Sequence, residues 1–235
     1  LGSSNGEDWL RRGGISGNVA GIVSVDRLVY RLLEDADPGV PHLDMPLPYP
    51  LDFEGWKDPV SLDRRTDGIF LSADGLLSES ALHRARIDLL NQVVRSSNAR
   101  VTIYRQAPGN DLELLDELGL SIPSDRVTVT DSLEFDDYLQ LMSRHRLVMG
   151  FGRNQLGGDI LGDALITQTA YAGAHRGDPF VGNIFPSLGI TEDGVGQAHQ
   201  AAVALIESDQ DYSETIEMAR SRARQNCAPE VVREK

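Results

Sequence analysis

From residue 61 onward, short apolar runs alternate with longer segments in which apolar residues recur at the spacing of an α-helix. This pattern predicts buried strands, each followed by an amphipathic helix. The predicted strands are Gly68–Leu71, Arg100–Tyr104, Arg126–Thr130, Arg146–Met149, Thr167–Tyr171 and Pro179–Val181. The predicted helices are Glu79–Arg95, Leu112–Leu118, Phe135–Arg144, Asp159–Ile166, Ala198–Glu207 and Tyr212–Gln225. Repeated strand–helix units favour an α/β fold, in which a parallel sheet carries helices on both faces.

Residues 1–60 follow a different pattern. Asn18–Ser24 predicts one short strand and Val25–Asp35 one helix, and six of the eleven prolines then lie between Pro38 and Pro59. Proline has no backbone N–H and cannot donate to a sheet, so this segment is predicted to be a linker or a covering strap. The chain is therefore divided into an N-terminal remnant with its linker, residues 1–60, and an α/β domain, residues 61–235.

The charge balance restricts the partners. Asp and Glu number 36 against 22 Lys and Arg, which gives a net charge of −14. A field of this sign repels phosphate backbones and anionic lipid, so the charge disfavours nucleic acid and membrane surfaces as partners, whereas a local basic pocket for one small anion is compatible with it. No apolar run approaches the roughly 18 residues of a transmembrane helix, so none is predicted.

The residue types that commonly hold metals are sparse. The single cysteine, Cys227, excludes an internal disulfide and a multi-cysteine zinc site. No two histidines stand at metal-binding spacing with a carboxylate between them, so neither a metal nor a resident cofactor is predicted. A lone cysteine fits a reducing compartment, and the predicted location is cytoplasmic.

Candidate binding residues follow the predicted strands, because ligands of an open parallel sheet bind beyond the carboxyl ends of its strands. Gly75 follows the first strand of the domain, where it permits a close backbone approach to a ligand or simply forms a turn. Arg105 adds a cation after the second strand. Thr130 ends the third strand, where free backbone groups suit recognition of a base edge.

The loop after the fourth strand, Gly150–Asp159, is rich in glycine and opens a helix. The backbone amides of Gly157 and Gly158 would face an anion at the helix N-terminus, and Arg153 would add a bidentate phosphate contact. One turn into the helix, the Asp163 carboxylate is placed to accept ribose hydroxyls, or alternatively to complement the helix dipole. The loop is not a Walker motif, because the Gly-Lys-Ser/Thr sequence is missing.

The order of these parts resembles the C-terminal, donor-binding domain of GT-B glycosyltransferases. The resemblance is carried by Leu139–Leu165, which contains the strand, the glycine loop with Gly152, and the acidic helix. It implies a Rossmann-like fold and places Asp163 where the family's acid binds the donor ribose. Gln155 stands where the family has a second acid, eight residues earlier. Residues 19–59 resemble the end of the family's N-terminal domain and its linker, and the chain is expected to lack the rest of the acceptor domain.

The resemblance implies a nucleotide-sugar-dependent, metal-independent glycosyltransferase, with an NDP-sugar as donor and a glycan or protein hydroxyl as acceptor. The catalytic base is not identified. Gln155, together with the absence of the family's Arg/Lys pair after the first strand, favours an alternative: a non-catalytic nucleotide-binding or protein-interaction module of the same fold. A sugar-nucleotide epimerase of related architecture is a third possibility.

Overall fold

A computed structural model describes residues 22–24, 41–44, 59–65, 67–72, 81–105, 111–117, 119–150, 159–174, 184–190 and 195–227. Residues 61 onward form a six-stranded parallel sheet in the order β5-β4-β3-β6-β7-β8. Its strands are β3 (Asp67–Ser72), β4 (Val101–Tyr104), β5 (Val127–Thr130), β6 (His145–Gly150), β7 (Ala170–Ala174) and β8 (Gly189–Ile190). The predicted α/β fold with a Rossmann-like parallel sheet is confirmed.

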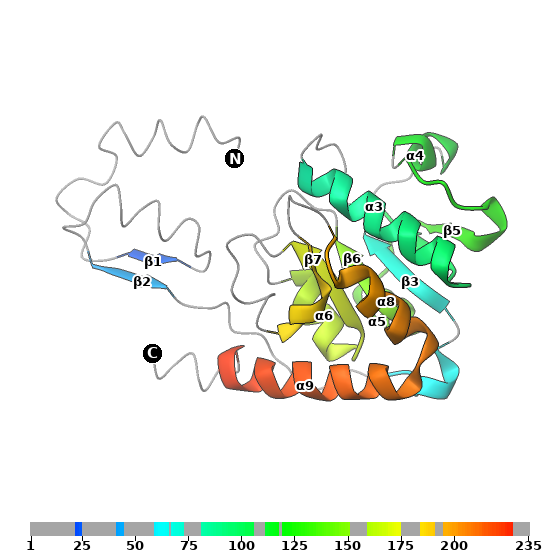
Figure 1. Ribbon diagram of the computed structural model, residues 1–235. Helices are drawn as coiled ribbons and strands as arrows, with labels where there is room; N and C mark the ends of the chain where they lie inside the picture. Colours follow the sequence, from blue (N-terminus) through cyan, green and yellow to red (C-terminus); the bar gives the residue numbers. More distant parts are fainter. Residues whose placement is uncertain are drawn as a thin grey trace, which may run out of the picture.

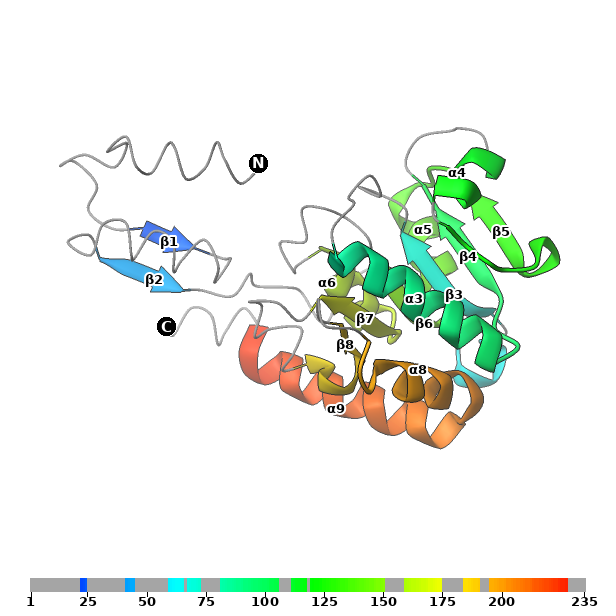
Figure 2. The ribbon, with the colours of Figure 1, turned by 45° about the horizontal axis from the view of Figure 1, so that its top comes forward.

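The helices cover both faces of this sheet (Figures 1 and 2). They are α3 (Ala81–Ser96), α4 (Asp111–Glu117), α5 (Phe135–Met142), α6 (Asp159–Ile166), α8 (Ala198–Glu207) and α9 (Asp209–Cys227), with short 3₁₀ turns η1 (Leu62–Arg64), η2 (Ser124–Arg126) and η3 (Pro186–Leu188). Helices α3 and α8 contact each other on one face, and α5 and α6 follow on the other. Helix α9 runs along the edge of the domain against α6, α8 and β7.

The core lies where the sheet meets these helices, and it confirms the amphipathic pattern of the sequence. Ile69, Phe70 and Leu71 of the central strand β3 are fully buried. Leu139 and Met142, the predicted core face of α5, are also fully buried. Gly119 ends α4 with a φ of 58°, as predicted for a helix C-terminal cap. No helix among the described residues is long and apolar enough to cross a membrane.

A second, two-stranded sheet precedes the domain. It pairs β1 (Ile22–Ser24) with β2 (His42–Asp44) in parallel. Strand β1 confirms the end of the predicted strand at residues 18–24, but β2 lies inside the segment assigned to a linker or strap. The three residues of β2, which follow Pro41 and precede Pro46, all have a backbone N–H and can pair in a sheet. The assignment of this segment to a linker or strap stays a prediction. The predicted helix at residues 25–35 lies outside the described residues.

The strand predicted at Thr167–Tyr171 begins three residues later, at Ala170. Thr167 and Gln168 instead close α6: the Gln168 N–H donates to Leu165 O at 3.2 Å and the Thr169 N–H donates to Ala164 O at 2.7 Å. This pair of bonds ends a helix with one residue in the left-handed region, and Gln168 has a φ of 54°. Pro179–Val181, another predicted strand, lies outside the described residues, and the short strand β8 was not predicted.

Gln168→Gly is expected to raise the free energy of unfolding by roughly 0.5–1 kcal/mol. A left-handed conformation costs a residue with a Cβ about 1–2 kcal/mol, whereas glycine adopts it freely at a smaller cost in chain entropy. Urea denaturation at constant m-value measures the change. Gln168→Ala is the matched control, because it removes the same side chain and keeps the Cβ. A gain of equal size in Gln168→Ala would contradict the backbone explanation.

Candidate functional site

The carboxyl ends of four neighbouring strands, β5, β4, β3 and β6, lie in one row. Ser72 at the end of β3 pairs with Tyr104 of β4 on one side and with Gly150 of β6 on the other. Tyr104 in turn pairs with Thr130 of β5. This register follows from strands of similar length that are all parallel. The loops that carry the predicted binding residues therefore start side by side along one edge of the sheet.

The chain reverses its direction across the sheet between β3 and β6. From β3 the order runs outward to β4 and β5, and from β6 it runs the other way to β7 and β8. Connections on the two sides lie on opposite faces, which opens a crevice at the reversal, and open α/β sheets bind ligands there. Gly75 follows β3, and Gly152, Arg153, Gln155, Gly157 and Gly158 follow β6. These six lie outside the described residues, and their roles stay predictions.

Asp163 lies on α6, which follows β6, and is only 8% exposed. The Tyr138 hydroxyl, on α5, donates a hydrogen bond to its Oδ2 at 3.2 Å. A buried carboxylate needs such donors, because burial removes it from water. The bond joins two helices on the same face of the sheet and fixes the orientation of the carboxylate.

An aromatic cluster positions Tyr138. Its ring centroid lies 5.0 Å from that of Tyr104 and 5.8 Å from that of Phe70, and the exposed Phe135 stacks on it at 6.3 Å. Such offset and edge-on arrangements are the favourable ones for aromatic pairs. Tyr104 is the last residue of β4, so the cluster links Asp163 to the edge of the sheet where the strands end. The sequence analysis missed both tyrosines, although Tyr104 ends a predicted strand.

This architecture occurs in solved structures. No protein-family model matches the sequence, and no curated protein matches it significantly. A TarM mutant from S. aureus, in complex with UDP, alpha-GlcNAc-glycerol and fondaparinux, superposes with a TM-score of 0.68 at 11% identity over 99% of this chain and 45% of its own. Sucrose-phosphate synthase from Thermosynechococcus elongatus gives 0.68 at 15% identity, over 99% and 61%. Anabaena HepE, in complex with UDP and glucose, gives 0.68 at 14% identity, over 100% and 66%.

The chain has the fold of a GT-B glycosyltransferase C-terminal domain. The resemblance drawn from Leu139–Leu165 is thereby confirmed at the level of the fold. The chain spans between 45% and 66% of the length of these three structures.

Arg105 and Thr130 lie together at the ends of β4 and β5. The Arg105 backbone N–H donates to Thr130 O at 3.1 Å. The Arg105 guanidinium pairs with Asp131 at 2.5 Å and with Asp111 at 2.9 Å. Its hydrogen bond to Asp131 raises the pKa of Arg105. The two carboxylates compensate the charge of Arg105. Neither ion pair was predicted from the sequence, although Asp131 directly follows Thr130. Ligand binding by Arg105 and Thr130 stays a prediction.

Within the described part of the chain, no group of three His, Cys, Asp or Glu side chains is placed to hold a metal ion. His145, the fully buried histidine of β6, instead contacts the Leu141 carbonyl and the Thr102 hydroxyl, each at 2.9 Å. This histidine is therefore part of the packing under the sheet, and the absence of a metal from the site stays a prediction.

Proposed function

We propose that the chain is the donor-binding part of a nucleotide-sugar-dependent glycosyltransferase, which transfers a sugar from an NDP-sugar to a hydroxyl acceptor without a metal. One observation carries the proposal. The strand order reverses at the paired ends Ser72 and Gly150, and the buried Asp163 lies on the helix that follows. The structures with the same fold include complexes of TarM and HepE with UDP.

The proposed chemistry uses a different group for each part of the donor. The acceptor oxygen attacks the anomeric carbon of the sugar, the bond from that carbon to the diphosphate oxygen breaks, and the acceptor proton goes to a base that the sequence does not identify. Arg153 and the amides of Gly157 and Gly158 would stabilise the negative charge that develops on the diphosphate. Asp163, oriented by Tyr138, would accept hydrogen bonds from the ribose hydroxyls.

Gln155 favours a second candidate, a nucleotide-binding module without transferase activity. It stands where the GT-B family has an acid, so that part of the sugar-binding motif is altered. An amide accepts hydrogen bonds from sugar hydroxyls less strongly than a carboxylate does, because charge-assisted bonds are roughly twice as strong. A module of this kind would bind the nucleotide and release it unchanged.

A ligand screen followed by a transfer assay tests both candidates. The melting temperature of the chain is measured with UDP, GDP and ADP, and with the sugar derivative of whichever nucleotide binds. Saturation at about 100 times Kd stabilises the folded state by about 2.7 kcal/mol, so a true donor raises the midpoint. Release of the nucleotide from its sugar with glycan or protein acceptors supports the transferase. Binding without turnover in any combination supports the module, and no shift with any nucleotide contradicts both.

A further inference from the structure

A cavity of about 660 Å³ lies at the opposite edge of the sheet from the crevice described above. Its walls are residues 59–62, which lead into the domain, and one face of α9 between Tyr212 and Gln225. Arg65, which precedes β3, and Gln168, which precedes β7, form its floor. The amino ends of the strands, rather than their carboxyl ends, therefore face this cavity.

The floor of the cavity carries an arginine whose charge is compensated by no carboxylate in the described part of the chain. Arg65 is only 6% exposed. Its guanidinium donates to His145 O at 2.6 Å, to Thr167 O at 2.7 Å and to the Thr169 hydroxyl at 3.1 Å. These three oxygens are neutral. Burial, and the nearby charge of Arg146, lower the pKa of Arg65, which shows that its surroundings disfavour a positive charge.

Tyr212 completes this part of the wall. The Arg65 guanidinium lies 5.4 Å from the centre of the Tyr212 ring, within the range of a cation–π contact. Burial raises the pKa of Tyr212 to about 12, so its hydroxyl stays protonated at neutral pH. The hydroxyl donates a hydrogen bond to the Gln168 carbonyl. The ring and Arg65 are thus held in place, and the wall they form is preorganised.

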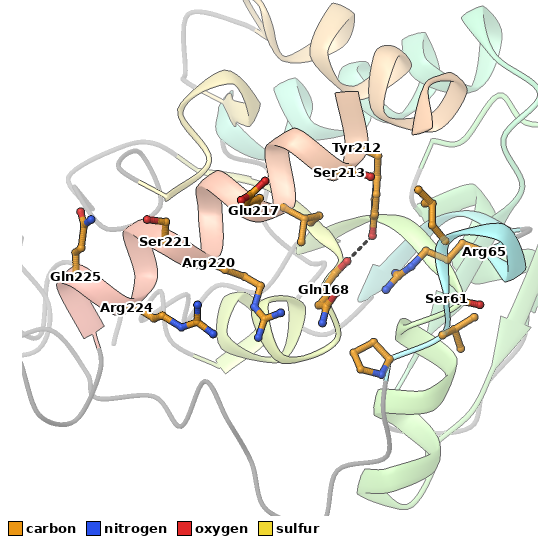
Figure 3. A pocket seen from close by; sticks show the side chains of 14 residues that line it. Ser61, Arg65, Gln168, Tyr212, Ser213, Glu217, Arg220, Ser221, Arg224 and Gln225 are labelled. Carbon is orange, nitrogen blue, oxygen red and sulfur yellow. Dashed lines mark hydrogen bonds between the residues drawn. The ribbon is translucent and has the colours of Figure 1, made fainter. Parts of the chain in front are cut away.

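Two further arginines reach the same cavity from α9. Arg220 and Arg224 are one helical turn apart, which places them on the same face of the helix. Figure 3 shows both guanidinium groups extending below α9 toward the space beside Gln168, whereas the carboxylate of Glu217 points to the other side. Among the residues that the structure describes, three arginines and one glutamate line the cavity, in a chain whose net charge is −14.

We propose that this cavity binds a small phosphomonoester that carries a polar body, such as a sugar phosphate. Guanidinium groups bind phosphate oxygens in bidentate geometry, and Arg220 and Arg224 are spaced to share one phosphate group. The volume lies within the range of small-molecule sites and far exceeds a single phosphate ion. Hydroxyl and amide side chains, Ser61, Gln168, Ser213, Ser221 and Gln225, supply the polar contacts for the rest of the molecule.

Calorimetric titration of the chain with ribose 5-phosphate tests the proposal, with ribose and inorganic phosphate as separate probes at matched ionic strength. We expect saturable binding of ribose 5-phosphate, weaker binding of inorganic phosphate and none of ribose. Arg220→Gln combined with Arg224→Gln is expected to weaken ribose 5-phosphate binding at least fivefold. Arg222→Gln is the control for a loss of positive charge from α9, one charge where the double variant loses two, and Arg222 is not among the residues lining the cavity. It should stay within twofold of the parent chain.

Three results would overturn the inference. The first is that neither ribose 5-phosphate nor inorganic phosphate binds saturably. The second is that Arg222→Gln loses as much affinity as the double variant. The third is that the double variant keeps its affinity while circular dichroism shows that it is folded. Competition with UDP separates this site from the proposed donor site. If UDP displaces ribose 5-phosphate, the sugar phosphate lies in the donor crevice, and this result would also overturn the inference. A chain that binds no nucleotide can still bind ribose 5-phosphate, so the two proposals can fail independently.

Discussion

Arg65→Ala is expected to lower the free energy of unfolding by about 3–5 kcal/mol, because the side chain joins three elements through its guanidinium. It donates to the His145 carbonyl at the start of β6 and to Thr167 and Thr169 between α6 and β7. Alanine would leave these buried oxygens without the donor. Losing a buried charged donor costs several kcal/mol in this way, since the acceptors keep the whole penalty of their removal from water.

Urea denaturation measures this loss, and two variants separate its causes. Arg64→Ala changes the neighbouring arginine, which is exposed, and should stay within about 0.5 kcal/mol of the parent chain. Arg65→Lys keeps the charge but offers one ammonium in place of the planar fork, so it should lose stability by an intermediate amount. A loss in Arg65→Ala no larger than in Arg64→Ala would mean that these hydrogen bonds do not hold the elements together.

The two adjacent arginines also show where sequence reasoning stops. Arg64 and Arg65 are the same residue type at adjacent positions, yet one is exposed and the other buried. What separates them is contact with residues 80 to 104 positions away along the chain. Local sequence patterns carry no information about such partners. The sequence analysis could therefore allow a basic pocket somewhere in this acidic chain, but it could not place the cavity beside Arg65.

The regular elements were predictable for the opposite reason. The spacing of apolar residues along the sequence predicts which positions are buried. It predicted the buried strand residues Ile69 and Leu147 and the buried face of α5. One error occurred where a helix cap competes with residue types that favour a strand. Thr167–Thr169 has the residue types of a strand, but the hydrogen bonds to Ala164 and Leu165 make it the end of α6.

The candidate site was predictable in part. Its place at the carboxyl ends of the strands followed from the alternation of strands and helices, and Asp163 followed from the glycine loop before it. Tyr138, the hydrogen-bond partner of Asp163, lies 25 positions earlier on another helix. Its position in the sequence indicates only an aromatic residue of a helix that packs on the sheet. Arg105 was likewise predicted as a cation for a ligand, without its two aspartate partners. The pairing with Asp131 requires β4 and β5 to lie side by side, and the pairing with Asp111 depends on how the chain turns from β4 into α4.

Asp163→Asn is expected to weaken binding of a ribonucleotide donor roughly tenfold or more, which corresponds to about 1.4 kcal/mol. Asparagine keeps the size of the side chain and one acceptor oxygen but loses the charge that strengthens hydrogen bonds from ribose hydroxyls. The preference for ribonucleotides over 2′-deoxyribonucleotides should decrease with it, because the group that distinguishes them is altered. Calorimetry on folded protein measures both affinities, with the nucleotide that gives the largest thermal shift.

The ribo/deoxy ratio separates a ribose contact from a purely structural role. Asp163 accepts a hydrogen bond from Tyr138, so its replacement lowers stability under either interpretation, and a lower melting temperature decides nothing. Tyr138→Phe removes that hydrogen bond and keeps the charge, so it should weaken ribonucleotides less than Asp163→Asn does while the ratio stays above one. Asp136→Asn makes the same charge change at an exposed position of α5 and should leave both affinities unchanged. A ratio that is identical in the parent chain and in Asp163→Asn would exclude Asp163 from the ribose site, because a carboxylate that held the hydroxyls could not lose its charge without changing how strongly the 2′-hydroxyl is recognised.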